Sequence, residues 1–158
     1  MFAAQNDEKR FELNLRRLYS IVIWLSLLQS VFMTIFSDLF VGILYGEAYA
    51  PTSTILRIVV WFVTFSYLGS IRNIWVLAKN KQKYLWIINA SGALLNVALN
   101  WAMIPFLGAV GASIASVLTQ MFANFILGFI LRPIRENNKL LLKSLNPKTI
   151  YELFRTDK

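Results

Sequence analysis

The chain has 158 residues, of which 57% are apolar and only 15% are charged, well below the roughly one quarter that is usual in soluble proteins. Too few polar side chains remain to cover a soluble globule of this size, so the composition indicates a membrane protein. The chain contains no Cys and no His, which excludes disulfides, thiolate or imidazole metal sites, and nucleophiles or bases of these two types.

Apolar segments follow one another along most of the chain. The first is interrupted only by Asp38, and at about 1.5 Å per helical residue it is long enough to cross a hydrocarbon core of about 30 Å. The stretch from Tyr84 to Leu131 carries no charge and is broken by Pro105 and Gly108, which predicts that Pro105 closes one helix before the chain turns into the next. We therefore predict an all-α integral membrane protein with four transmembrane helices. The predicted spans are 18–44, 55–78, 84–104 and 111–131.

Positive charges gather in three places: before the first span, between the second and third spans, and after the fourth. The other two connections are almost free of Lys and Arg, so the positive-inside rule places both termini in the cytoplasm. The segments 1–17 and 132–158 are expected to be basic, amphipathic cytoplasmic flanks that attract anionic membrane lipids. Because the net charge of +8 is spread over these flanks and the lysine-rich connection between the second and third spans, we expect no nucleic-acid partner.

Polar residues recur on one side of three of the predicted spans. Asn96 and Asn100 each lie within about 20° of Asn89 around the third helix, and Gln120 and Asn124 are four residues apart on the fourth. An amide that faced lipid would leave its hydrogen bonds unmade, so these side chains must face protein or water. They line a hydrated path for a polar substrate, or they bond neighbouring helices together. The first span adds Ser26, Ser30, Thr34 and Asp38 at a spacing of four residues.

Two arginines in the second span are further candidates for a substrate path. Arg57 pairs with Asp38 across the short outer connection, extends to the outer surface, or binds an anionic headgroup. Arg72 extends inward to the lysine-rich connection, or binds an anionic headgroup. The predicted spans hold no pair of carboxylates for acid–base chemistry, and the chain has no Mg²⁺-binding acidic motif and no Walker A motif. We therefore expect no catalytic residue, no metal site, no cofactor and no enzymatic activity.

Several segments resemble polysaccharide flippases in their order and spacing. The segment Gly46–Ile58 resembles a G-x-x-Y-x-x-A-x-x-x-L-R-I element that follows a span in that family. Three later segments are similar to the family's L-N-x-x-L-N, I-P and G-x-x-G-A-A-x-A run, with Ser113 in place of the second Ala. These segments are Leu95–Asn100, Ile104–Pro105 and Gly108–Ala115.

The resemblance is to the C-terminal part of a Wzx-like polysaccharide or O-antigen flippase, in the multidrug/oligosaccharidyl-lipid/polysaccharide exporter superfamily. It implies that residues 18–131 resemble a polysaccharide biosynthesis C-terminal domain of a multi-pass protein in the bacterial inner membrane. It also implies an undecaprenyl-diphosphate-linked oligosaccharide as substrate. Such exporters usually have a dozen or more spans in two lobes, so the chain is expected to be a fragment that works with a missing N-terminal lobe.

Two alternatives to this hypothesis are a complete four-span carrier that works as an oligomer, and a scaffold that anchors polysaccharide assembly enzymes without transport. Small carriers of the first kind depend on a carboxylate inside the first span, and the only residue of this type there is Asp38, near the outer end.

Overall fold

The computed structural model describes residues 2–146, with side chains described from residue 7 onward. The described part is helical, without strands. Residues 147–158 of the predicted cytoplasmic tail lie outside it. The helical segments are α1 (Phe2–Tyr45), η1 (Glu47–Tyr49), α2 (Thr52–Ala78), α3 (Lys83–Met121), η2 (Phe122–Ile126), α4 (Leu127–Ile130), η3 (Arg132–Ile134) and α5 (Arg135–Ser144).

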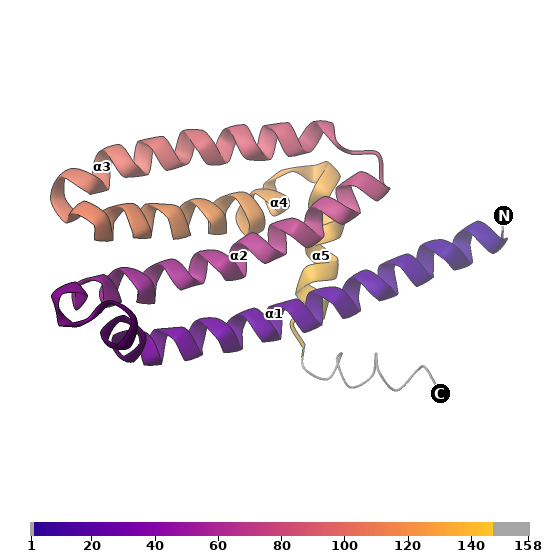
Figure 1. Cartoon of the computed structure of the whole chain (residues 1–158). Coiled ribbons are helices and arrows are strands. Elements are labelled where there is room, and N and C mark those ends of the chain that lie inside the picture. The colour runs from indigo at the N-terminus through magenta and orange to yellow at the C-terminus, as the bar shows by residue number, and fades with distance from the viewer. Residues whose placement is uncertain (1, 147–158) are drawn as a thin grey trace.

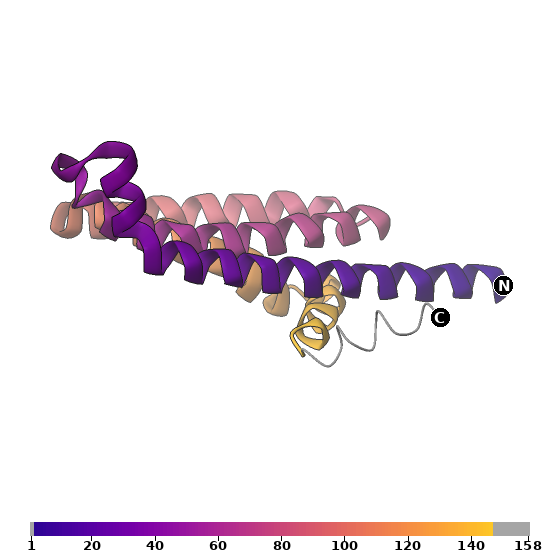
Figure 2. The same ribbon diagram turned by 60° about the horizontal axis from the view of Figure 1, so that its bottom comes forward.

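The long helices run back and forth along a common direction (Figures 1 and 2). α2 lies in the middle, where it packs against α1 on one side and against α3 on the other. α3 folds back on itself, so that its second arm, continued by η2 and α4, returns beside its first arm (Figure 1).

α1 joins the predicted basic flank and the first predicted span in one continuous helix. The flank 1–17 contains no Pro and no Gly, so nothing in its sequence interrupts the helix before the apolar part begins. The flank is therefore the first turns of α1 rather than a separate surface helix.

The reversal within α3 occurs at Gly108, whose φ of 55° and ψ of −132° lie in a region open to glycine. The expectation that Pro105 closes the first arm is wrong: helical geometry continues through Pro105 and breaks only at Gly108. The two arms meet closely there, since a Cβ at position 111 would lie 2.6 Å from the carbonyl oxygen of Met103. Glycine thus decides both the place and the tightness of the reversal.

Three helical stretches of the described chain are long and apolar enough to cross a membrane: Asp7–Tyr45, Thr52–Ala78 and Lys83–Ile130. The third contains the reversal at Gly108. The count of four spans stays a prediction, because it requires each arm of this stretch to cross the membrane separately.

The packed interior of the chain lies toward one end of the bundle. It joins apolar side chains from α1, α2, the start of α3 and the region from η2 to α5, and Trp75 and Ile88 are among its most deeply buried members. Elsewhere large apolar side chains point outward, and Trp101 and Phe106 are 83% and 86% exposed. Apolar surface of this extent is typical of helices that face lipid.

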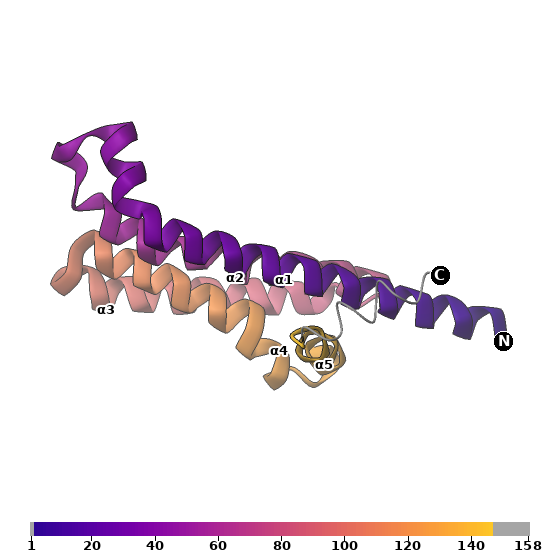
Figure 3. The same cartoon turned by 90° about the horizontal axis from the view of Figure 1, so that it is seen from below.

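The three basic segments meet at this same end of the bundle. Lys79, after α2, forms an ion pair with Glu8 of α1, and Lys81 donates a 2.7 Å hydrogen bond to the carbonyl of Pro133 in η3. α5 crosses α1 and is seen end-on in Figure 3. The connection at the opposite end begins at Gly46, with a φ of 80°. The described structure thus gathers its basic segments at one end, as the alternation of charge along the chain requires.

Candidate functional site

A polar pocket of about 390 Å³ lies between α2 and the two arms of the α3 hairpin. Phe62 of α2 forms part of its wall, and the first arm contributes Ile88, Asn89, Gly92, Ala93 and Asn96. We call it the amide pocket. The second arm and η2 contribute Ser116, Thr119, Gln120, Ala123 and Asn124.

Helical periodicity explains why these side chains share one space. Asn89 and Asn96 are seven residues apart, which returns to the same face of the first arm after about two turns. Ser116, Gln120 and Asn124 follow at steps of four residues on the returning arm. Because the hairpin lays the arms antiparallel, the two polar faces meet.

Hydrogen bonds order the amides around the pocket. Asn96 Nδ2 donates to Thr119 Oγ1 at 3.3 Å across the two arms, and Asn100 Nδ2 donates to Asn96 Oδ1 at 2.9 Å along the first arm. Asn124 donates to the side-chain oxygen of Gln120. Asn89 is exposed at the rim. The pocket is therefore lined by groups that both donate and accept hydrogen bonds, with no charged side chain among its lining residues.

Part of the pocket lining comes from a π-helical segment, η2, in which the amide of Leu127 bonds the carbonyl of Phe122 five residues back. Such segments are rare and often occur at functional sites. Outside donors bind two carbonyls of this segment: Arg72 Nη1 bonds Ala123 at 2.8 Å, and Asn138 Nδ2 bonds Phe125 at 2.8 Å.

Arg72 lies behind the pocket, not in it. Its side chain is 3% exposed, and its Nη2 donates to Asn73 Oδ1 at 3.1 Å in addition to the bond to Ala123. Of the two alternatives that the sequence left open for Arg72, extension inward to the lysine connection is not what the structure has, because the guanidinium binds the carbonyl of Ala123 in η2 instead. Arg72 therefore joins α2 to η2, the segment that contributes Ala123 and Asn124 to the amide pocket.

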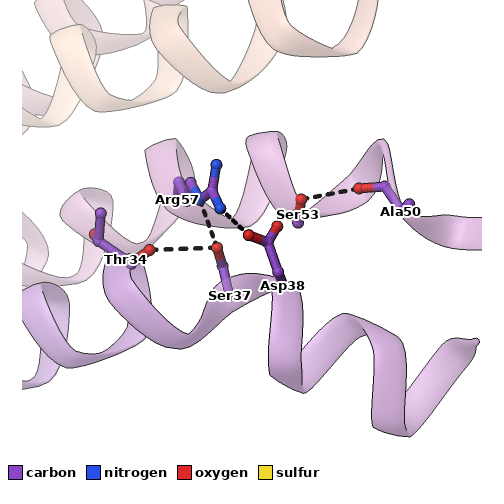
Figure 4. Close-up of polar contacts among 6 residues, drawn as sticks. All are labelled: Thr34, Ser37, Asp38, Ala50, Ser53 and Arg57. Carbon is purple, nitrogen blue, oxygen red and sulfur yellow. Dashed lines mark hydrogen bonds and ion pairs between the residues drawn. The ribbon is translucent and has the colours of Figure 1, made fainter. Parts of the chain in front are cut away.

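Arg57 lies toward the opposite end of the bundle, near the connection between α1 and α2 (Figure 4). Its guanidinium forms an ion pair with Asp38, and its Nε donates to Ser37 Oγ at 2.7 Å. The same close-up shows Ser53 Oγ bonded to the carbonyl of Ala50 at the start of α2. Both charged groups of this pair are satisfied by each other, away from the pocket.

The hydroxyl groups of α1 serve a different purpose from the amides of α3. Ser30 Oγ lies 2.9 Å from Thr64 Oγ1 of α2, and Thr64 Oγ1 also donates to the carbonyl of Ser26. Ser26 and Ser30 are buried at this interface. This stripe holds α1 against α2, whereas the amides of α3 line a pocket.

Seven lining residues are not among the predicted site residues: Phe62, Ile88, Gly92, Ala93, Ser116, Thr119 and Ala123. Ser116, Thr119 and Ala123 recur at i, i+3 and i+7, a pattern that marks one face of a helix. The sequence pattern did not indicate Thr119, because the polar residues spaced four apart on this helix include its neighbour Gln120 instead. Among residues 7–146, no group of three or more Asp or Glu side chains could hold a metal ion.

The comparison with protein-family models gives one decisive match. The MatE family model matches residues 2–102, well over half of the chain. The chain belongs to the MatE family. Its members are membrane transporters of the multidrug/oligosaccharidyl-lipid/polysaccharide exporter superfamily rather than enzymes.

The matched segment of this MatE chain includes α1, α2 and most of the first arm of α3. It contains Asn89, Asn96 and Asn100 but ends before Gln120 and Asn124. Comparisons with curated proteins and with solved structures give no significant match. The family therefore establishes a multi-pass membrane transporter, and the pocket is the feature from which its substrate can be argued.

Proposed function

We propose that the chain is part of a flippase that moves undecaprenyl-diphosphate-linked oligosaccharides across the bacterial inner membrane for surface polysaccharide synthesis. The amide pocket is the observation that carries this proposal. Its lining combines donors and acceptors without charge, which suits the hydroxyl groups of sugars, since these also donate and accept.

The rim of the pocket supports a path rather than a closed site. Asn89 and Ala93 are both exposed there. An amide that faced lipid would lose its hydrogen bonds, so in the membrane this rim must meet water or further protein. In this proposal the N-terminal lobe of the flippase covers the rim, and sugar passes between the lobes.

The proposed topology has four spans, with both arms of the α3 hairpin crossing the membrane. The end of the bundle that carries the basic segments lies in the cytoplasm, as the positive-inside rule requires. The amide pocket then opens within the membrane between the second, third and fourth spans. The ion pair of Arg57 with Asp38 lies near the periplasmic surface.

A complementation experiment tests this function. The full-length protein is expressed in a bacterium that lacks its own lipid-linked oligosaccharide flippase, and surface polysaccharide is measured. We expect Asn89→Leu combined with Gln120→Leu to reduce export at least about tenfold. The double variant would lose two hydrogen bonds to the sugar of the substrate, each of about 1 kcal/mol.

Gln29→Leu is the matched control. Gln29 is also an exposed amide, but it lies on α1 in the groove between α1 and α2. Export at the wild-type level in the pocket variant, at equal amounts of protein in the membrane, would remove the amide pocket from the proposed path. Equal losses in the pocket variant and in the control would do the same.

A further inference from the structure

A second pocket, of about 290 Å³, lies at the basic end of the bundle where α5 crosses α1. We call it the α1–α5 pocket. Its lining residues are Lys9, Glu12, Leu13 and Arg16 from α1, and Leu140 and Lys143 from α5. Those from α1 recur at i, i+3, i+4 and i+7, so they form one continuous helix face.

The lining carries three cationic side chains and one carboxylate. No ion pair joins Glu12 to Lys9 or Arg16 in the part of the chain that the structure describes. The Nε of Arg16 is buried and has no hydrogen-bond partner within residues 7–146. A buried guanidinium N–H without an acceptor is costly, so an anionic oxygen at this position would relieve it.

The pocket is held in shape by the packing of α5 on α1. Tyr19 donates from its hydroxyl to Asn137 Oδ1 at 3.0 Å, and Ser20 Oγ donates to the carbonyl of Ser144 at 2.9 Å. All four of these residues are fully buried. The two cationic faces are therefore fixed relative to each other rather than brought together by chance.

Exposed apolar side chains lie along the outside of α1 beyond the pocket. Ile21, Trp24 and Leu28 recur at i, i+3 and i+7, so they form one helix face, and they are 38%, 41% and 68% exposed. We call these three residues the α1 stripe. A ligand with a phosphate in the pocket could lay an acyl chain along this stripe, which a free phosphate ion could not use.

We propose that the α1–α5 pocket binds the phosphate of an anionic phospholipid, with one acyl chain against the α1 stripe of Ile21, Trp24 and Leu28. This site is separate from the amide pocket, and lipid binding can be measured without any transport assay. The proposal therefore stands or falls independently of the proposed function.

Native mass spectrometry of the full chain in detergent tests the proposal. We expect phosphatidylglycerol to bind more tightly than phosphatidylcholine. Lys9→Gln and Arg16→Gln should each weaken phosphatidylglycerol binding about fivefold, because one cation near a lipid surface contributes about that factor. Lys9 is exposed, so its variant keeps the fold even if the Arg16 variant does not.

Lys83→Gln is the matched control, since Lys83 is an exposed cation at the same end of the bundle but outside the pocket. Equal weakening by Lys83→Gln, or no weakening by Lys9→Gln, would show that only the general positive field attracts lipid and would overturn the site. Equal binding of phosphatidylcholine would also overturn it. If inorganic phosphate displaced phosphatidylglycerol at similar concentration, the pocket would be a site for free anions and not for lipid.

Discussion

Gly69 of α2 lies in direct contact with Asn124 of η2, which lines the amide pocket: a Cβ at position 69 would lie 2.4 Å from Asn124 Oδ1. Gly69→Ala should therefore push the Asn124 amide away from α2. We expect a loss of about 1 to 3 kcal/mol in the free energy of unfolding, the usual range for overpacking, as measured by denaturation in mixed micelles.

Gly42→Ala provides the control for this substitution, because a Cβ at position 42 would meet nothing within 4 Å. It should leave stability unchanged or raise it slightly, since Ala favours a helix over Gly. Shortening the neighbour in the Gly69→Ala, Asn124→Ala double variant should restore part of the loss. If the Gly69→Ala protein were as stable as wild type, the close contact between α2 and η2 would be refuted.

Arg72 should be needed for the stability of the bundle. Arg72→Gln loses the charged donor of the 2.8 Å bond to the carbonyl of Ala123, and hydrogen bonds to charged groups contribute about 1.5 to 3 kcal/mol. Arg57→Gln should lower the free energy of unfolding by less than about 1 kcal/mol, because its ion pair with Asp38 is largely exposed. Equal losses in the two variants, measured in mixed micelles, would contradict this difference.

The contact between Ser30 and Thr64 should stabilise the α1–α2 interface only modestly. A double-mutant cycle with Ser30→Ala and Thr64→Val is expected to give a coupling energy of about 0.6 kcal/mol, the average for such bonds between membrane helices. The same pair of variants should leave transport unchanged, since neither residue lines the amide pocket. A transport defect at normal expression would place this hydroxyl stripe on the substrate path instead.

Removing the hydroxyl of Tyr19 should loosen α5. Tyr19→Phe leaves the buried Asn137 Oδ1 without its donor, which should lower the free energy of unfolding by about 1 to 3 kcal/mol. Hydrogen exchange should then become faster in α5 than in the first arm of α3. Equal protection of α5 in the variant and in wild type would show that its apolar contacts alone hold it.

Much of the architecture follows from local pattern. Long apolar stretches, the absence of Pro and Gly at the start of the chain, and the glycines at 46 and 108 determine where helices run and where they turn. The spacing of Asn89 and Asn96, and of Gln120 and Asn124, placed all four on polar faces. These features depend only on neighbours along the helix, which periodicity reports directly.

Pro105 shows the limit of local signals, since a proline near the end of a helix can be accommodated as well as terminate it, and here the helix ends only at Gly108. The two arginines show a second limit. From the sequence, Arg57 could reach the membrane surface, bind a lipid headgroup or pair with an acidic residue, and Arg72 could reach the surface or bind a headgroup. Only the packing of α2 on its neighbours pairs Arg57 with Asp38 and bonds Arg72 to the carbonyl of Ala123.

The sequence by itself determined that this is an all-helical membrane protein with polar helix faces and one basic end, because composition and periodicity act residue by residue. Tertiary structure alone decided which polar face encloses a pocket and which serves as helix contact. The stripe of α1 meets hydroxyl partners on α2, whereas the hairpin at Gly108 brings the amides of both arms of α3 around one space. That outcome depends on which faces meet, and the meeting is set by contacts between residues far apart in the chain.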